Sequence, residues 1–170
     1  SKGLVQGGIG NDTIKVTGLG VTSASLKAGD GADLMSITGG ITDGSLFGGD
    51  GNDSFNFTGG RATGLVDTGA GVDSVLLGAA ADSITLTGAL TSTTLKAGAE
   101  ADSILVKANA NAAYFEAGTG ADTLNFKSSS VSLVATTIKG ATGADVVSLY
   151  GANDVVFDIA SGDSVFGGTK

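Results

Sequence analysis

The stretch GGDGNDSFN at residues 48–56 contains the pattern that decides the fold. From Asp53 onward, apolar side chains fall at every second position, at Phe55 and again at Phe57. Such alternation is typical of a half-buried β-strand. The glycines in front of it indicate a tight turn, because glycine adopts positive φ without steric cost. The stretch therefore predicts a turn that delivers one carboxylate, Asp53, to the beginning of a strand.

The same unit recurs along the chain, in a repeat marked by aspartates. The ten that align are Asp12, Asp33, Asp53, Asp73, Asp82, Asp102, Asp122, Asp145, Asp154 and Asp163. Most neighbours in this series are 20 to 23 residues apart, and three pairs are 9 residues apart. An apolar residue follows every one of these aspartates two positions later. Self-similarity at a fixed period of this size is the signature of a solenoid.

A second set of short strands lies between the first, each with a large apolar residue two positions before a small one. Those apolar residues are Leu26, Leu46, Leu95, Phe115 and Ile138. Strands this short need neighbours to be stable. We therefore predict an all-β fold, a parallel β-solenoid (β-roll or β-helix) with two short strands per coil and about eight coils. It is expected to form a single domain over residues 1–170, and both ends fall inside a repeat, which indicates a segment of a larger protein.

The 9-residue steps predict that the aspartates divide between two edges of the solenoid. A step of about 20 residues completes a coil and keeps an aspartate on the same edge, whereas a step of 9 is half a coil. The set expected on one edge is Asp12, Asp33, Asp53, Asp73 and Asp154. The set expected on the opposite edge is Asp82, Asp102, Asp122, Asp145 and Asp163.

The composition argues against several classes of function. The chain has no His and no Cys, so the common ligands of transition metals and the usual general bases are missing. Its net charge of -8 argues against binding nucleic acid or anionic lipid, which need a basic surface. No apolar run is long enough for membrane insertion. With one Arg, two Tyr and no Trp, the chain is poorly equipped to cleave polysaccharides, as other parallel β-solenoids do, and we expect no enzyme activity.

A column of stacked aspartates needs a counter-ion. Like charges about 5 Å apart repel by roughly 0.8 kcal/mol in bulk water, and by several-fold more at a protein surface. Calcium is a hard cation that takes oxygen ligands from carboxylates and backbone carbonyls, and a glycine-rich turn can present both. The ten aspartates are therefore candidate Ca²⁺ ligands. The alternative is that each aspartate closes its own turn by hydrogen bonding to nearby backbone, with no ion.

Two stretches, GGIGNDTIK (7–15) and GGDGNDSFN (48–56), resemble the G-G-x-G-x-D-x-U-x nonapeptide of the RTX, or hemolysin-type, calcium-binding repeats. AGDGADLMS (28–36), TGAGVDSVL (68–76) and AGTGADTLN (117–125) lack only the first glycine. The resemblance implies a parallel β-roll that holds Ca²⁺ between adjacent turns. The aspartate ligands that it implies are Asp12, Asp33, Asp53, Asp73 and Asp122. The turn carbonyls that it implies lie near Gly8, Gly10, Gly29, Gly31, Gly49, Gly51, Gly69, Gly71, Gly118 and Gly120.

The chain departs from the family pattern at several turns. In the family, nonapeptides follow one another and both edges bind ions, whereas here most coils carry the motif on one edge only. In GAAAD (78–82) and GAEAD (98–102) the inner glycine is replaced by Ala80 and Glu100. Residues with a β-carbon resist positive φ. Weaker or distorted sites are therefore expected at these two turns.

Together these patterns predict a calcium-stabilised structural segment of a large secreted or cell-surface protein, such as an adhesin, an S-layer protein or a motility protein. Calcium sites of extracellular modules are weak, with dissociation constants of about 10⁻⁴ to 10⁻³ M. Two alternatives stay open: a segment of a phage or virion fibre, and a non-catalytic module of a secreted polysaccharide-modifying enzyme. The expected partners are calcium ions, together with other surface proteins or glycans.

Overall fold

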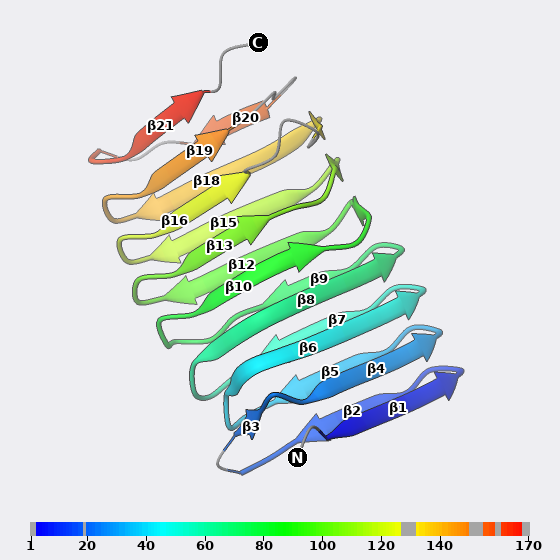
Figure 1. The fold of residues 1–170 in the computed structure, drawn as a ribbon. Helices are drawn as coiled ribbons and strands as arrows, with labels where there is room; N and C mark the ends of the chain where they lie inside the picture. Colours follow the sequence, from blue (N-terminus) through cyan, green and yellow to red (C-terminus); the bar gives the residue numbers. More distant parts are fainter. Residues whose placement is uncertain (1–2, 19, 127–131, 150–154, 159–160, 168–170) are drawn as a thin grey trace.

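The chain winds into a stack of coils (Figure 1). The computed structural model describes residues 3–18, 20–126, 132–149, 155–158 and 161–167. These residues are all-β with no helix, and their parallel sheets form a β-solenoid of about 7 turns with roughly 20 residues per turn. The predicted fold class is confirmed, and the expected number of coils is close to this count.

Two long parallel sheets form the walls of the solenoid. The first sheet has the order β1 (Leu4–Ile9), β4 (Ser25–Asp30), β6 (Ile41–Asp50), β8 (Ala62–Ala70), β10 (Ser83–Thr87), β13 (Ser103–Val106), β16 (Thr123–Phe126), β19 (Val146–Leu149) and β21 (Ser164–Gly167). The second sheet has the order β2 (Thr13–Val16), β5 (Leu34–Ile37), β7 (Ser54–Phe57), β9 (Ser74–Leu76), β12 (Thr94–Ala99), β15 (Tyr114–Thr119), β18 (Thr136–Thr142) and β20 (Val155–Asp158). Each strand pairs with the corresponding strand of the next coil, as the repeat predicts.

Ladders of apolar side chains fill the interior between the two sheets. One ladder in the first sheet consists of Leu26, Leu46, Val66 and Leu86, and one in the second sheet consists of Met35, Phe55, Val75 and Leu95. All of these side chains are almost completely buried. Further along, the rings of Phe115 and Phe126 meet edge to face, with 5.1 Å between their centroids. A single coil cannot bury such a face alone, so contact between coils stabilises the fold.

The prediction of two strands per coil was incomplete. Several later coils add a third strand, and these strands form a separate small sheet: β11 (Leu90–Thr91), β14 (Ala110–Asn111) and β17 (Leu133–Val134). Nearer the N-terminus, β3 (Val21–Thr22) pairs with β6 in the first sheet. Strands of two residues are too short to show alternation, so no pattern in the sequence marks them.

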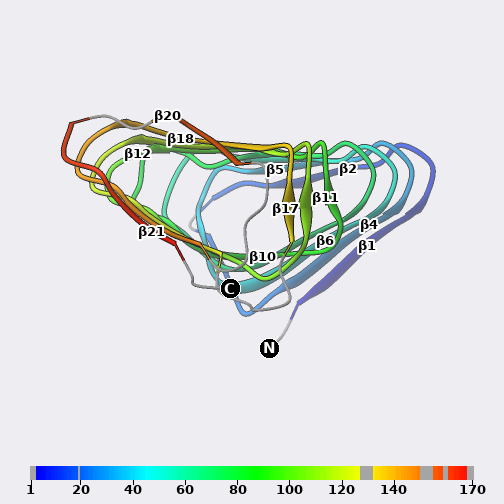
Figure 2. The ribbon, with the colours of Figure 1, turned by 90° about the horizontal axis from the view of Figure 1, so that it is seen from above.

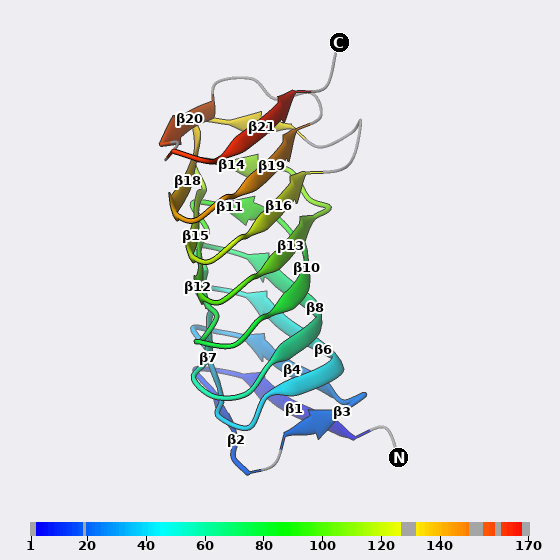
Figure 3. The same ribbon diagram turned by 90° about the vertical axis from the view of Figure 1, so that its left-hand side faces the viewer.

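The tight turns change sides part-way along the stack. We name the side where the chain passes from the first sheet to the second the first edge, and the side where it returns the second edge. Glycine-rich turns that end in aspartate lie on the first edge as far as Asp73, before β9, and on the second edge from Asp82, before β10. Viewed along the axis, the early coils therefore project to one side and the later coils to the opposite side (Figure 2). Figure 3 faces the second edge, with the later turns stacked above one another.

Candidate functional site

Each tight turn combines glycines that permit its curvature with an aspartate that ends it. Gly49 and Gly51 have φ values of 118° and 129°, which residues with a β-carbon rarely adopt. A β-carbon on either glycine would also overlap the carbonyl oxygen of Gly29 or Gly31 in the preceding coil. These glycines therefore set both the shape of the turn and the close stacking of coils. Asp53 then occupies the position directly before β7.

The glycines predicted to line the sites have the expected backbone conformation. Positive φ values are found at all ten: Gly8, Gly10, Gly29, Gly31, Gly49, Gly51, Gly69, Gly71, Gly118 and Gly120. Several of their carbonyl oxygens lie close to the next coil. The carbonyl oxygens of Gly8, Gly29 and Gly49 lie where a β-carbon on the following coil's glycine would be. These oxygens therefore contribute to the stacking contact itself.

The aspartate side chains form two ladders of hydrogen bonds between successive coils. On the first edge, the N–H of Asp33 donates to Oδ1 of Asp53 at 3.0 Å, and the N–H of Asp53 donates to Oδ1 of Asp73 at 2.9 Å. On the second edge, the N–H of Asp82 donates to Oδ1 of Asp102 at 2.8 Å. The same bond joins Asp12 to Asp33, Asp102 to Asp122, Asp122 to Asp145, and Asp145 to Asp163. Each bond satisfies a backbone donor at the corner of a coil.

The predicted division of aspartates between the edges is confirmed for the described residues. The first-edge ladder contains Asp12, Asp33, Asp53 and Asp73, and the second-edge ladder contains Asp82, Asp102, Asp122, Asp145 and Asp163. Asp154 lies outside the described residues. Its neighbour Val155 pairs with Thr136 in the second sheet.

The alternative, in which each aspartate closes its own turn by hydrogen bonding to backbone without an ion, agrees with the structure only in part. At Asp53 and Asp73 the carboxylate accepts a backbone N–H of the preceding coil. At Asp82 the N–H of Gly78, in the same turn, also lowers the pKa of the carboxyl group, as the alternative predicts. The aspartates therefore tie coils together. This role involves only one of the two carboxylate oxygens.

The second oxygen, Oδ2, is buried and accepts no hydrogen bond at eight aspartates. They are Asp12, Asp33, Asp53, Asp73, Asp82, Asp102, Asp122 and Asp145. Asp53 and Asp102 are each 3% exposed, and Asp145 is 0% exposed. A buried acceptor without a partner costs roughly 1–3 kcal/mol, and more when it is charged. A proton or a cation at Oδ2 would remove this cost.

Burial raises the pKa values of these carboxylates. Desolvation raises the pKa of Asp53 to about 6, although the N–H of Asp33 lowers it in part, and the charges of Asp73 and Asp33 raise it further. Desolvation also raises the pKa of Asp102 to about 7, with neighbouring carboxylates again adding to the shift. Desolvation is the main cause of raised pKa values at Asp73, Asp82, Asp122 and Asp145 as well. The ionised form of each ladder is thus poorly compensated by the protein alone.

At two first-edge turns the second oxygen packs closely against a glycine, where a side chain would not fit. A β-carbon added to Gly48 would overlap both Oδ2 of Asp53 and the carbonyl oxygen of Thr68. A β-carbon added to Gly7 would lie 2.5 Å from Oδ2 of Asp12 and 2.5 Å from a carbonyl oxygen of the next coil. At both turns a carboxylate oxygen and a carbonyl oxygen therefore converge over a glycine.

At one second-edge turn two carboxylates pack closely against a glycine. A β-carbon on Gly140 would lie 2.8 Å from Oδ2 of Asp145 and 2.6 Å from Oδ2 of Asp163. Sequence analysis did not single out Gly140, Gly7 or Gly48 as parts of the sites. The signal was nevertheless present at Gly7 and Gly48, as the first glycine of the complete nonapeptide.

These donors fit a hard cation. Carboxylate and carbonyl oxygens are the ligands that calcium prefers. Across the described residues, no three side chains of Asp, Glu, His or Cys gather into one group that could hold a metal ion. An ion at these turns would therefore take at most two carboxylates and complete its shell with carbonyl oxygens and water.

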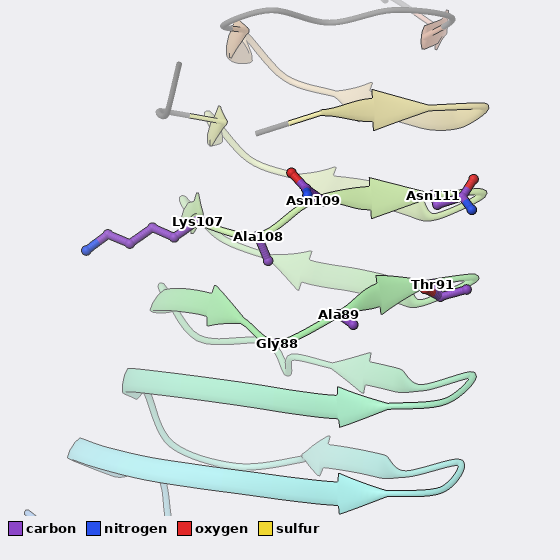
Figure 4. A pocket seen from close by; sticks show the side chains of 7 residues that line it. All are labelled: Gly88, Ala89, Thr91, Lys107, Ala108, Asn109 and Asn111. Carbon is purple, nitrogen blue, oxygen red and sulfur yellow. The ribbon is translucent and has the colours of Figure 1, made fainter. Parts of the chain in front are cut away.

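A separate hollow of about 580 Å³ lies beside the third sheet (Figure 4). Its lining consists of Gly88, Ala89, Thr91, Lys107, Ala108, Asn109 and Asn111. The side chain of Lys107 extends away from the other labelled side chains. The lining contains no carboxylate, so it does not offer the paired acids that glycoside hydrolysis uses.

No protein-family model, curated protein or solved structure matches this chain. Within the part of the chain that the structure describes, no helix is long and apolar enough to cross a membrane. The resemblance to the hemolysin-type repeats stays a prediction that depends on the motif residues.

Proposed function

We propose that this chain is a calcium-stabilised structural β-roll segment of a large secreted or cell-surface protein. The observation that carries the proposal is the pair of aspartate ladders whose second oxygens are buried without a partner, as at Asp53 and Asp102. Like charges stacked on a partly desolvated edge destabilise the fold unless cations lie among them. The net charge of -8 agrees with this function.

Each aspartate has two roles in this proposal. Oδ1 accepts the N–H of the preceding coil and fixes the position of the turn, as between Asp33 and Asp53. Oδ2 is buried without a partner in the protein and serves as the ligand. Bound calcium supplies the positive charge that offsets repulsion along the ladder. In calcium-free solution the carboxylates oppose stacking, so folding and ion binding are coupled.

A structural role is favoured because the repeated features all serve contact between coils. The apolar ladders, the positive-φ glycines and the aspartate ladders each join one coil to the next. The resemblance to the hemolysin-type repeats points to an exported protein, where weak calcium sites of about 10⁻⁴ to 10⁻³ M are sufficient.

Circular dichroism tests this proposal directly. The chain is stripped of metal with EGTA, and CaCl₂ is then added in excess. We expect a gain of β-sheet signal and a smaller hydrodynamic radius by size-exclusion chromatography when calcium is added. The controls are MgCl₂ and an equivalent ionic strength of NaCl, which should not reproduce the change. Identical spectra and melting temperatures with and without calcium would refute the proposal.

A further inference from the structure

We propose that copies of this chain associate head to tail, with the last coil of one copy stacked on the first coil of the next. The surfaces concerned are the outer sides of β1 and β2 at one end of the stack and of β20 and β21 at the other (Figure 1). This inference goes beyond the proposed function and does not depend on calcium binding.

Both ends of the stack expose residues that belong to the apolar interior. Val5 in β1 is 45% exposed, whereas Leu26, its partner in the next coil, is 2% exposed. At the other end, Val165 in β21 is 36% exposed, whereas its partner Val147 is 4% exposed. Within the described residues, each of the two sheets ends in a strand that is paired on one side only. The backbone groups on the other side can pair with a further parallel strand.

The two ends match each other in apolar residues on the outer face of the first sheet. Leu4 in β1 is 60% exposed and Phe166 in β21 is 59% exposed. Successive strand pairings place Leu4 and Phe166 at the two ends of one column of this sheet. If a second copy continues the same register, its Leu4 takes the position next to Phe166. Contact between them removes apolar surface of both residues from water.

The two ends also match in charge along the second sheet. Lys15 in β2 and Asp158 in β20 are the end residues of one column of this sheet. The last four positions of that column alternate in charge: Lys96, Glu116, Lys139 and Asp158. In the same register as before, Lys15 of a second copy continues the alternation next to Asp158. Opposite charges at neighbouring positions favour strand pairing.

The agreement of both columns at one register favours a second copy of this chain as the occupant. The aspartate turns of the two end coils lie on opposite edges, so the contact is made by strands and not by these turns (Figure 2). The two surfaces differ, which makes the contact heterologous. Such a contact repeats at every free end and produces an open filament along the solenoid axis.

The test is the mass of the assembly over a series of protein concentrations, measured in CaCl₂ by analytical ultracentrifugation, with electron microscopy to detect filaments. We expect the mass to rise with concentration without stopping at a dimer. Lys15→Glu places like charges next to each other and should raise the apparent dissociation constant by about fivefold. Asp158→Lys should do the same, and the double variant should restore association. Lys107→Glu, the matched control, changes the same charge far from both end coils and should have no effect.

A second variant tests the apolar match without changing charge. Leu4→Ser should weaken association and leave the fold intact, because Leu4 is 60% exposed. Circular dichroism verifies that every variant is folded. A chain that stays monomeric at all concentrations would show that something other than a second copy covers the end coils, and the inference would fail. It would also fail if assembly stopped at two copies, or if the double variant associated no better than the single ones.

The outcomes separate this inference from the proposed function. A chain that folds on addition of calcium but stays monomeric refutes the head-to-tail contact alone. A chain that assembles as expected, with the same spectrum in EGTA and in CaCl₂, refutes the calcium-stabilised function and leaves the contact standing.

Discussion

The two oxygens of Asp53 have different surroundings within one side chain. Oδ1 accepts a backbone N–H from the preceding coil at 3.0 Å, and Oδ2 is buried without a hydrogen bond. The first contact stabilises the stack with or without a metal ion. Oδ2 stabilises the stack only when a cation or a proton is bound to it. A substitution that keeps one oxygen and replaces the other therefore distinguishes the two roles.

Asp53→Asn is expected to change stability in opposite directions with and without calcium. Asparagine keeps an oxygen that can accept the N–H of Asp33 but removes the buried charge, so unfolding in EGTA should require more urea at neutral pH. In calcium the same variant should lose part of the stabilisation that the ion provides. Asp53→Ala also removes the hydrogen bond and should lose about 1–3 kcal/mol in both conditions. Equal effects of both substitutions in both conditions would contradict this assignment of roles.

Glu100 is a strained residue at one of the second-edge turns. Its φ is 72°, whereas Ala80, at the same place in the preceding turn, does not have positive φ. The expectation that a residue with a β-carbon resists positive φ is met by Ala80 and was wrong for Glu100. Stacking on neighbouring coils fixes the backbone there. A β-carbon on Gly120, in the following coil, would overlap the carbonyl oxygen of Glu100.

Glu100→Gly should therefore stabilise the protein by about 1 kcal/mol, because left-handed backbone costs a residue with a β-carbon about that much. The substitution also removes a charge that raises the pKa of Asp102. Glu100→Gln isolates the effect of the charge and should give a smaller gain. Ala80→Gly should lose stability, since glycine there only increases the entropy of the unfolded chain. Urea unfolding of the three variants measures these differences, and a loss in Glu100→Gly would refute the strain argument.

At the scale of elements, a charged column runs along the outer face of the second sheet. Lys96 in β12, Glu116 in β15 and Lys139 in β18 lie opposite one another in successive coils. Nζ of Lys96 lies 3.3 Å from Oε2 of Glu116, and the hydroxyl of Tyr114 donates to the same oxygen at 3.2 Å. Alternating charges therefore favour this register, in which one residue of each coil faces its equivalent in the next.

Glu116→Lys would place three positive charges in line and should destabilise the fold by about 0.2–1 kcal/mol at low salt. Added NaCl should reduce the loss, because these side chains are partly exposed and salt screens them. Glu116→Gln, the matched control, should lose less and depend less on salt. Thermal melts at low and high NaCl measure the effect. A loss that is the same at both salt concentrations would show that packing, and not charge, is responsible.

At the scale of the whole molecule, the stack carries two acidic ladders on opposite sides. The aspartate turns move from the first edge to the second between Asp73 and Asp82, on either side of the three-residue strand β9. Because each ladder occupies a different edge, repulsion is divided between two shorter columns. Removal of calcium should nevertheless weaken both halves, since carboxylates with raised pKa values occur in each, as at Asp53 and Asp102.

In calcium-free buffer, the folded protein should become more stable as the pH falls from about 8 to about 4. The pKa is about 6 at Asp53 and about 7 at Asp102 in the folded chain, against an ordinary value of 3.8. At a pH between 3.8 and these raised pKa values, the folded chain binds more protons than the unfolded chain. Acid therefore favours folding in this range. This stabilisation is complete when the pH is below the ordinary aspartate pKa of 3.8, and it is lost as the pH rises through 6 to 7.

Urea unfolding of dialysed, metal-free protein at a series of pH values measures this dependence. With saturating calcium, the trend should reverse, because protons compete with the ion for the same carboxylates. A metal-free protein whose unfolding midpoint falls steadily on acidification would contradict the raised pKa values.

The sequence by itself determined the solenoid, the strand-forming segments and the division of aspartates between two edges. These follow from local alternation and from the spacing of residues such as Asp53, Asp73 and Asp82, both of which are present in one dimension. Only the tertiary structure decided which oxygen of each carboxylate accepts a hydrogen bond, where the third sheet forms, and that carboxylate oxygens pack against Gly7, Gly48 and Gly140. Those properties depend on the separation of adjacent coils, because carbonyl and carboxylate oxygens of one coil pack against the backbone of the next.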